Sequence, residues 1–124
     1  VDHVLWSFKN SPGGDILVPK LKSYKLIDLI NSFNPNLRLK KIGIRPGEKI
    51  HEEMITESDS LNTIELKKYY VILPNTFSEN KILKTKSYYK KKFNSILVPK
   101  NFKYNSGNNK DFLSVKDLKK FFQN

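Results

Sequence analysis

The chain has 124 residues, enough for one small domain and too few for two. Apolar residues make up 38%, so the core is expected to be thin and some apolar surface to need a partner domain. The net charge of +11 comes almost wholly from scattered lysines, with Arg38 and Arg45 as the only arginines, which argues against a nucleic-acid-binding face. The lack of cysteine excludes disulfides and thiolate metal sites, and no apolar run reaches the roughly 18–20 residues of a membrane span.

The N-terminal part of the chain predicts a helix, a strand and a second helix. Apolar residues at helical spacing indicate a helix over residues 2–8, and the Asn-Ser-Pro-Gly-Gly run at 10–14 predicts a loop. Residues 15–19 form a short apolar run that is typical of a strand. Ser23 is a suitable N-cap for a helix over residues 24–33, which carries one apolar face.

The middle of the chain predicts short strands separated by turns. Apolar side chains along residues 37–44 indicate another strand, and a short helix is expected over residues 49–55. Residues 57–62 are polar and turn-like. Residues 63–66 and 69–73 predict two further strands, the second rich in aromatic and β-branched side chains.

The C-terminal part has the weakest pattern. Residues 75–95 are rich in lysine and poor in apolar anchors, which predicts a variable loop. A short strand is expected within residues 96–104 and a loop over 106–111, before a final helix that Ser114 caps. The mixed order of strands and helices indicates the α/β or α+β class.

The segment with the most chemical character is Arg-Pro-Gly-Glu at residues 45–48. This is the sequence of a type II turn, because Pro46 presets φ at the second position and Gly47 supplies a positive φ at the third. A plain turn is the simpler interpretation. The functional alternative is that the stiff turn holds Arg45 so that its planar guanidinium grips a diphosphate. Glu48 could then accept hydrogen bonds from sugar hydroxyls.

Three other motifs are rejected on their sequence context. His51 begins a zinc-protease pattern, but Ile55 stands where the second histidine is needed, so no metal site is expected. Tyr88 and Lys92 have the Tyr-x-x-x-Lys spacing of short-chain dehydrogenases, yet they lie in the lysine-rich stretch and are expected there by chance. The glycine pair at 13–14 lacks the strand–loop–helix context of a dinucleotide-binding motif.

Four segments resemble, in the right order, the C-terminal region of bacterial polysaccharide-biosynthesis proteins of the extended short-chain dehydrogenase/reductase type. The segments are GGDILVPKLKSYKLIDL (13–29), IGIRPGEKIHEEMITESDS (42–60), YYVILP (69–74) and FKYNSGNN (102–109). The resemblance is greatest to the inverting UDP-N-acetylglucosamine 4,6-dehydratases, and Pro46 favours that branch over relatives that carry histidine there. Two positions depart from the branch: Lys22 replaces a proline and Gly107 an aspartate.

The resemblance implies an α/β fold in which residues 1–124 are the C-terminal UDP-sugar-binding region and the N-terminal Rossmann domain is missing. That domain would bind NADP(H), and the family's catalytic residues would all lie upstream of Val1. By the match to the family's turn, Arg45 would bind the diphosphate of the UDP-sugar and Glu48 the nucleotide ribose, while Pro46 and Gly47 shape the turn. Because the first residue is not methionine, we expect a piece of a longer protein.

The sequence therefore predicts the substrate-side part of a UDP-N-acetylglucosamine 4,6-dehydratase of nucleotide-sugar, polysaccharide or flagellin-glycan biosynthesis, including the route to pseudaminic acid. This part is expected to be inactive alone, and the full-length enzyme to be a cytoplasmic homo-oligomer without nucleic-acid or membrane partners. Two alternatives stay open. One is a UDP-sugar epimerase of capsule synthesis; the other is a stand-alone basic module that binds nucleic acid or anionic surfaces, as the net charge of +11 allows.

Overall fold

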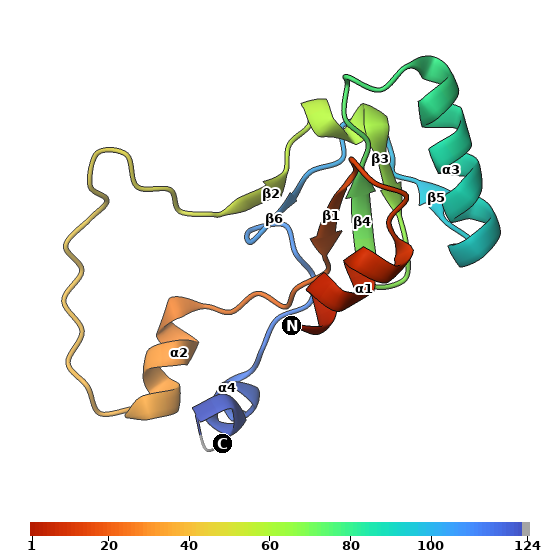
Figure 1. Cartoon of the computed structure of the whole chain (residues 1–124). Helices are drawn as coiled ribbons and strands as arrows, with labels where there is room; N and C mark the ends of the chain where they lie inside the picture. The colour runs from red at the N-terminus through yellow and green to blue at the C-terminus, as the bar shows by residue number, and fades with distance from the viewer. Residues whose placement is uncertain (123–124) are drawn as a thin grey trace. The chain divides into compact units, whose positions relative to one another are not determined.

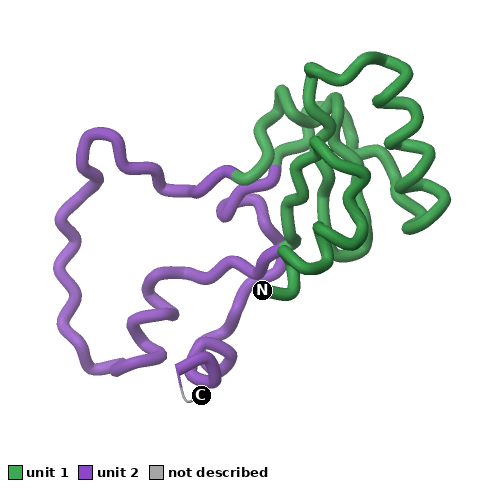
Figure 2. Tube along the Cα trace, viewed as in Figure 1, with its two compact units in different colours: residues 1–20, 54–103 green, residues 21–53, 104–124 purple. Residues whose placement is uncertain are grey.

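The computed structural model of the chain describes residues 1–122, and the chain forms two compact units. Unit 1 contains Val1–Lys20 and Met54–Lys103, and unit 2 contains Leu21–Glu53 and Tyr104–Asn124 (Figure 2). The chain crosses from one unit to the other three times, and each unit is therefore built from two separate stretches of sequence. The mixed α/β class predicted from the sequence is confirmed (Figure 1).

Unit 1 is a small antiparallel sheet combined with helices. Its strands follow the order β1-β4-β3-β5, and every neighbouring pair is antiparallel. The strands are β1 (Ile16–Pro19), β3 (Thr63–Glu65), β4 (Tyr69–Ile72) and β5 (Ile96–Leu97). The helices are α1 (Asp2–Asn10), the 3-10 helix η1 (Ser58–Asn62) and α3 (Glu79–Phe93). The predicted helix at 2–8 and the predicted strands at 15–19, 63–66 and 69–73 are thus confirmed within a few residues.

The core of unit 1 lies between the central strands and α3. Five buried side chains form it: Ile64, Leu66, Val71, Leu73 and Tyr89. Ile64 and Val71 face each other across the β3–β4 pair, so the alternation of each strand aims them at the same side of the sheet. Trp6 of α1 adds an aromatic layer, with ring centroids 4.3 Å from Tyr69 and 5.2 Å from Phe93.

The predicted loop over residues 75–95 is wrong, because α3 occupies most of it. Ser78 caps the helix by accepting a hydrogen bond from the Lys81 backbone, and Asn94 ends it in the left-handed conformation at φ 53°. The helix buries Tyr89 and Thr85 on one face, while most of its lysines stay in solvent. Since only a narrow apolar face is needed once a sheet covers it, the low apolar content of this stretch is misleading.

Unit 2 is built around two helices, α2 (Leu26–Phe33) and α4 (Val115–Phe122), together with the short strand β6 (Tyr104–Asn105). Leu118 of α4 is buried, and the rings of Phe33 and Phe122 lie 4.4 Å apart where the two helices meet. The hydroxyl of Tyr104 accepts a hydrogen bond from the Leu21 backbone N–H and donates one to the Leu21 carbonyl. Few other apolar side chains of this unit are buried, as the thin core expected from composition requires.

Three local predictions over residues 23–55 are wrong. Ser23 does not cap α2, because the N-cap of this helix is Lys25. The backbone of Ser23 instead forms a parallel bridge with Phe112. Within the described residues, 37–44 pairs with no strand and stays extended and exposed, because alternating apolar residues form a strand only where another strand pairs with them. The predicted helix at 49–55 is replaced by the strand β2 (Glu53–Ile55).

Helix α4 begins with a reciprocal cap that should make its N-terminus sensitive to acid. Asp117 accepts hydrogen bonds from the Ser114 hydroxyl at 2.6 Å and the Ser114 N–H at 3.1 Å, and it donates its own N–H to the Ser114 hydroxyl. The Ser114 hydroxyl, and then the backbone bond, hold the pKa of Asp117 below its usual range. Because the folded pKa is lowered, the cap is stabilising above about pH 4 and is lost as Asp117 is protonated in more acidic solution.

The predicted outcome is that Ser114→Ala raises the pKa of Asp117 toward that of an ordinary aspartate and frays the first turn of α4 at neutral pH. Carboxyl-carbon NMR titration measures the pKa, and the amide shifts of residues 115–118 report the fraying. Ser87→Ala on the exposed face of α3 is the matched control. An unchanged Asp117 titration in Ser114→Ala would contradict the cap.

Candidate functional site

The Arg-Pro-Gly-Glu segment forms the turn that its sequence predicts. The Glu48 N–H donates to the Arg45 carbonyl oxygen at 3.0 Å, and Gly47 has a φ of +86°. This hydrogen bond from position four to position one, with a positive φ at position three, fits the type II turn. The Glu48 carboxylate also accepts a hydrogen bond from the Arg45 N–H at 2.9 Å, so the turn is closed twice. All four predicted site residues, Arg45, Pro46, Gly47 and Glu48, therefore lie together on one small hydrogen-bonded turn.

The guanidinium of Arg45 is available to a ligand. Its side chain is 74% exposed and that of Glu48 is 52% exposed. The Arg45 Nε lies 3.9 Å from a Glu48 carboxylate oxygen, and an exposed pair at this separation contributes little free energy. A doubly charged phosphate group can therefore displace Glu48 as the partner, and the planar guanidinium still offers donors for a bidentate contact.

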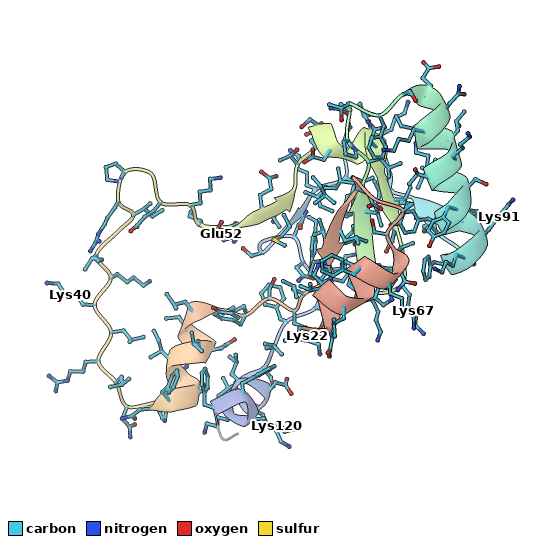
Figure 3. All side chains as sticks on the ribbon, in the orientation of Figure 1. Lys22, Lys40, Glu52, Lys67, Lys91 and Lys120 are labelled. Carbon is cyan, nitrogen blue, oxygen red and sulfur yellow. The ribbon has the colours of Figure 1, made fainter. Side chains whose placement is uncertain are left out.

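The segment that carries the turn has an excess of positively charged side chains. Its other cations are Arg38, Lys40, Lys41 and Lys49. Figure 3 shows Lys40 pointing outward from the extended stretch between α2 and the turn. Clustered cations attract anionic ligands over a distance of about one Debye length, roughly 8 Å at physiological salt. The arrangement favours an anion, and the turn supplies the only arginine that is held in a hydrogen-bonded loop among the described residues.

The turn is followed directly by contacts with the loop after β6. The Ser106 N–H donates to the Glu52 carbonyl oxygen at 2.9 Å, and the Glu52 N–H donates to the Ser106 hydroxyl at 3.1 Å. The same hydroxyl lies 3.3 Å from Nδ1 of His51. Sequence reasoning missed Ser106, although its segment, FKYNSGNN, belongs to the resemblance; nothing in its local pattern shows which residues it contacts.

Tyr88 and Lys92 do lie on a helix, contrary to the sequence prediction, and they contact each other. The Lys92 Nζ is 2.8 Å from the Tyr88 hydroxyl on α3. That hydroxyl donates its hydrogen to the Asn10 carbonyl oxygen at 2.9 Å. Since the hydrogen bond from Tyr88 to Asn10 joins α3 to the end of α1, Tyr88 and Lys92 have a structural role here.

Among the described residues, the glycine pair does not have the geometry of a dinucleotide-binding loop, and no cluster of metal ligands is found. The glycine pair Gly13–Gly14 joins a helix to a strand, which is the reverse of the strand-to-helix order that holds a pyrophosphate. A side chain at Gly14 would also meet the Phe77 ring at 2.9 Å, so this loop is already packed. Among residues 1–122, no three histidines, cysteines or acidic residues come together as metal ligands, and His51 is exposed.

Residues 1–74, more than half of the chain, match the sequence profile of the family of polysaccharide biosynthesis proteins. The chain belongs to this family. The matched residues include the whole Arg45–Glu48 turn, so the resemblance read from the segments at 13–29, 42–60 and 69–74 is confirmed.

Curated relatives agree with the family. Two proteins named UDP-N-acetylglucosamine 4,6-dehydratase (inverting), from Campylobacter jejuni serotypes O:2 and O:23/36, are 39% and 38% identical to it. Each match covers 95% of this chain but 35% of the relative, so the chain spans about a third of their length. An uncharacterized membrane protein of Methanocaldococcus jannaschii is 35% identical over 80 residues, covering 56% of this chain and 24% of that protein.

The fold of this polysaccharide biosynthesis protein is also found in a solved structure. The X-ray structure of Pen from Bacillus thuringiensis superposes with a TM-score of 0.67 over 96% of this chain and 34% of that one, at 22% identity. The likeness confirms the fold, which corresponds to about a third of that longer chain. No helix among residues 1–122 has the length and apolar character needed to cross a membrane.

Proposed function

We propose that this chain is the substrate-side part of a UDP-N-acetylglucosamine 4,6-dehydratase of the inverting type, and that the Arg45–Glu48 turn binds the diphosphate and ribose of the UDP-sugar. The proposal is carried by one observation: the exposed Arg45 guanidinium stands on a doubly closed turn in a chain that is 39% identical, over 95% of its length, to a protein with that name. The pathway that we propose is nucleotide-sugar biosynthesis for polysaccharides or flagellin glycans, including the route to pseudaminic acid.

In this proposal each residue of the turn has one task. Arg45 forms two parallel hydrogen bonds to diphosphate oxygens, and Glu48 moves from the Arg45 N–H to a ribose hydroxyl. Pro46 limits the backbone conformations of the turn, while Gly47 takes the positive φ that other residues adopt at a cost of roughly 1–2 kcal/mol. The turn therefore presents its donors without first having to fold.

NADP(H) and the catalytic acid–base residues belong, in this proposal, to a preceding domain of the full-length enzyme. This chain alone is expected to be inactive and to bind the nucleotide part of the substrate only. A cytoplasmic location and self-association of the full-length enzyme are parts of the same proposal.

Calorimetric titration of the chain with UDP and with uridine tests the proposal. UDP should bind and uridine should not, because the arginine contact needs the diphosphate. Equal binding of both, or of neither, would overturn it. If the chain instead bound single-stranded RNA with a steep dependence on salt, the basic-module alternative would replace it.

The reaction itself is tested with the full-length enzyme that contains this chain. Proton NMR of the product from UDP-N-acetylglucosamine should show a 4-keto-6-deoxy sugar with an inverted C5. A product that keeps its 6-hydroxyl and differs at C4 would indicate an epimerase.

A further inference from the structure

The imidazole ring of His51 lies directly on the backbone of Gly107. A Cβ atom added at Gly107 would come within 2.7 to 2.8 Å of three ring atoms of His51, closer than real Cβ contacts. The φ of Gly107 is not in the left-handed region, so glycine matters here for space and not for backbone conformation: a side chain at this position would displace the His51 ring. The chain thus has a close ring-on-backbone contact between two segments of unit 2 that are 56 residues apart in sequence.

Hydrogen bonds hold both sides of this contact. Ser106 is joined to Glu52 by two hydrogen bonds and lies within reach of the His51 ring nitrogen. On the other side, the Asn105 side-chain oxygen accepts hydrogen bonds at 2.9 Å from the N–H groups of Gly107 and Asn108, which fixes the loop that receives the ring. We call His51, Ser106 and Gly107 the His51 clamp.

The His51 clamp lies close to the Arg45–Glu48 turn along the chain. His51 is the third residue after Glu48, and such a stretch spans at most about 10 Å. On the other side of the turn, residues 37–44 are extended and exposed and belong to no helix or strand. The hydrogen bonds within the turn join Arg45 and Glu48 to each other and do not locate the turn in unit 2.

We propose that the His51 clamp is the positioning device for Arg45: by fixing the chain just after the turn, it sets the affinity of the turn for the UDP diphosphate. This inference rests on the proposed function and names further residues for the same site. With the clamp formed, the turn is held three residues before His51 and samples little space. Without the clamp, the turn would be held less closely and would sample more space, so more conformational entropy would be lost when the ligand binds.

A double-mutant cycle tests the pair. Gly107→Ala inserts a methyl group into the ring's place, and His51→Ala removes the ring; each should weaken UDP binding by roughly 2- to 10-fold, the range expected for freeing one or two side chains and their loop. The double variant should bind no more weakly than His51→Ala alone, because the added methyl group then has nothing to displace. Ser87→Ala, exposed on α3, is the control and should bind as the unchanged chain does.

A second readout does not need the ligand. In 1H–15N NMR spectra, Gly107→Ala should shift the amide signals of Gly47 and Glu48, and the ring protons of His51 should lose their nuclear Overhauser contacts to residue 107. Unmoved Gly47 and Glu48 signals would overturn the inference, whether or not UDP binds.

The two proposals fail in different ways. If UDP binds and Arg45→Ala weakens it while Gly107→Ala leaves the affinity unchanged, the His51 clamp is wrong and the proposed function stands. If UDP does not bind the unchanged chain, the proposed function fails; the affinity role of the clamp fails with it, and the NMR shifts then decide whether it positions the turn.

Discussion

Tyr89→Ala is expected to lower the free energy of unfolding of unit 1 by about 3–5 kcal/mol, the usual cost of removing a large aromatic side chain from a core. Tyr89 is 0% exposed and packs in the central cluster with Ile64, Val71 and Leu73. Alanine would leave a cavity that the rigid strands cannot fill. A loss of this size is comparable with the whole stability of a small domain, so the variant should be largely unfolded.

The hydroxyl of Tyr89 adds a polar term that can be separated from the cavity. It donates a hydrogen bond to the Asp15 carboxylate, which also accepts one from the Ser11 hydroxyl. Tyr89→Phe keeps the ring and removes only this donor, so a loss of about 1–3 kcal/mol is expected. Burial, and then the contact with Asp15, raise the pKa of Tyr89 well above its ordinary value.

This raised pKa gives the sign of an alkaline effect. Because the folded pKa lies above the unfolded one, the stabilisation from Tyr89 is complete below about pH 10 and is lost as the pH rises further. In Tyr89→Phe this part of the alkaline loss should disappear.

Denaturant unfolding followed by the fluorescence of Trp6, the single tryptophan, measures both variants, because Trp6 packs on Tyr69 and Phe93 within unit 1. Leu83→Ala is the matched control, since Leu83 lies on the same helix but is 65% exposed and should lose little. Equal effects of Leu83→Ala and Tyr89→Ala would show that α3 does not pack on the sheet through Tyr89.

Arg45→Ala is expected to weaken UDP binding by about 2–4 kcal/mol, roughly 30- to 1000-fold, as when one partner of a close charge pair is truncated. The reason is that the guanidinium supplies two aligned hydrogen bonds as well as a charge. Arg45→Lys keeps the charge but not the fork, so it should recover only part of the loss.

Arg38→Ala is the control for charge alone. Arg38 is the only other arginine, and it stands on the exposed extended segment seven residues before Arg45. Arg38→Ala should lower the affinity for UDP slightly, and this loss of affinity should be smaller at high salt than at low salt. If calorimetry gave the same affinity for Arg45→Ala and Arg38→Ala, the turn would have no specific role.

Features that depend on neighbours in sequence could be predicted from the sequence. The type II turn follows from Pro46 and Gly47 alone, because their allowed backbone angles leave few other conformations. The cap of α4 follows from Ser114 and Asp117, which stand three apart. The strand β4 follows from its aromatic and β-branched residues, and the family from the segment at 42–60.

Features that depend on partners distant in sequence were decided by the tertiary structure. Helix α3 forms in a lysine-rich stretch because the sheet covers Tyr89, while the apolar residues at 37–44 form no strand because no other described strand pairs with them. Ser23 pairs with Phe112 instead of capping α2, and the ring of His51 packs on the backbone of Gly107. The physical reason is common to all four: backbone angles and caps act over three or four residues, whereas burial and pairing depend on which distant segment supplies the contact.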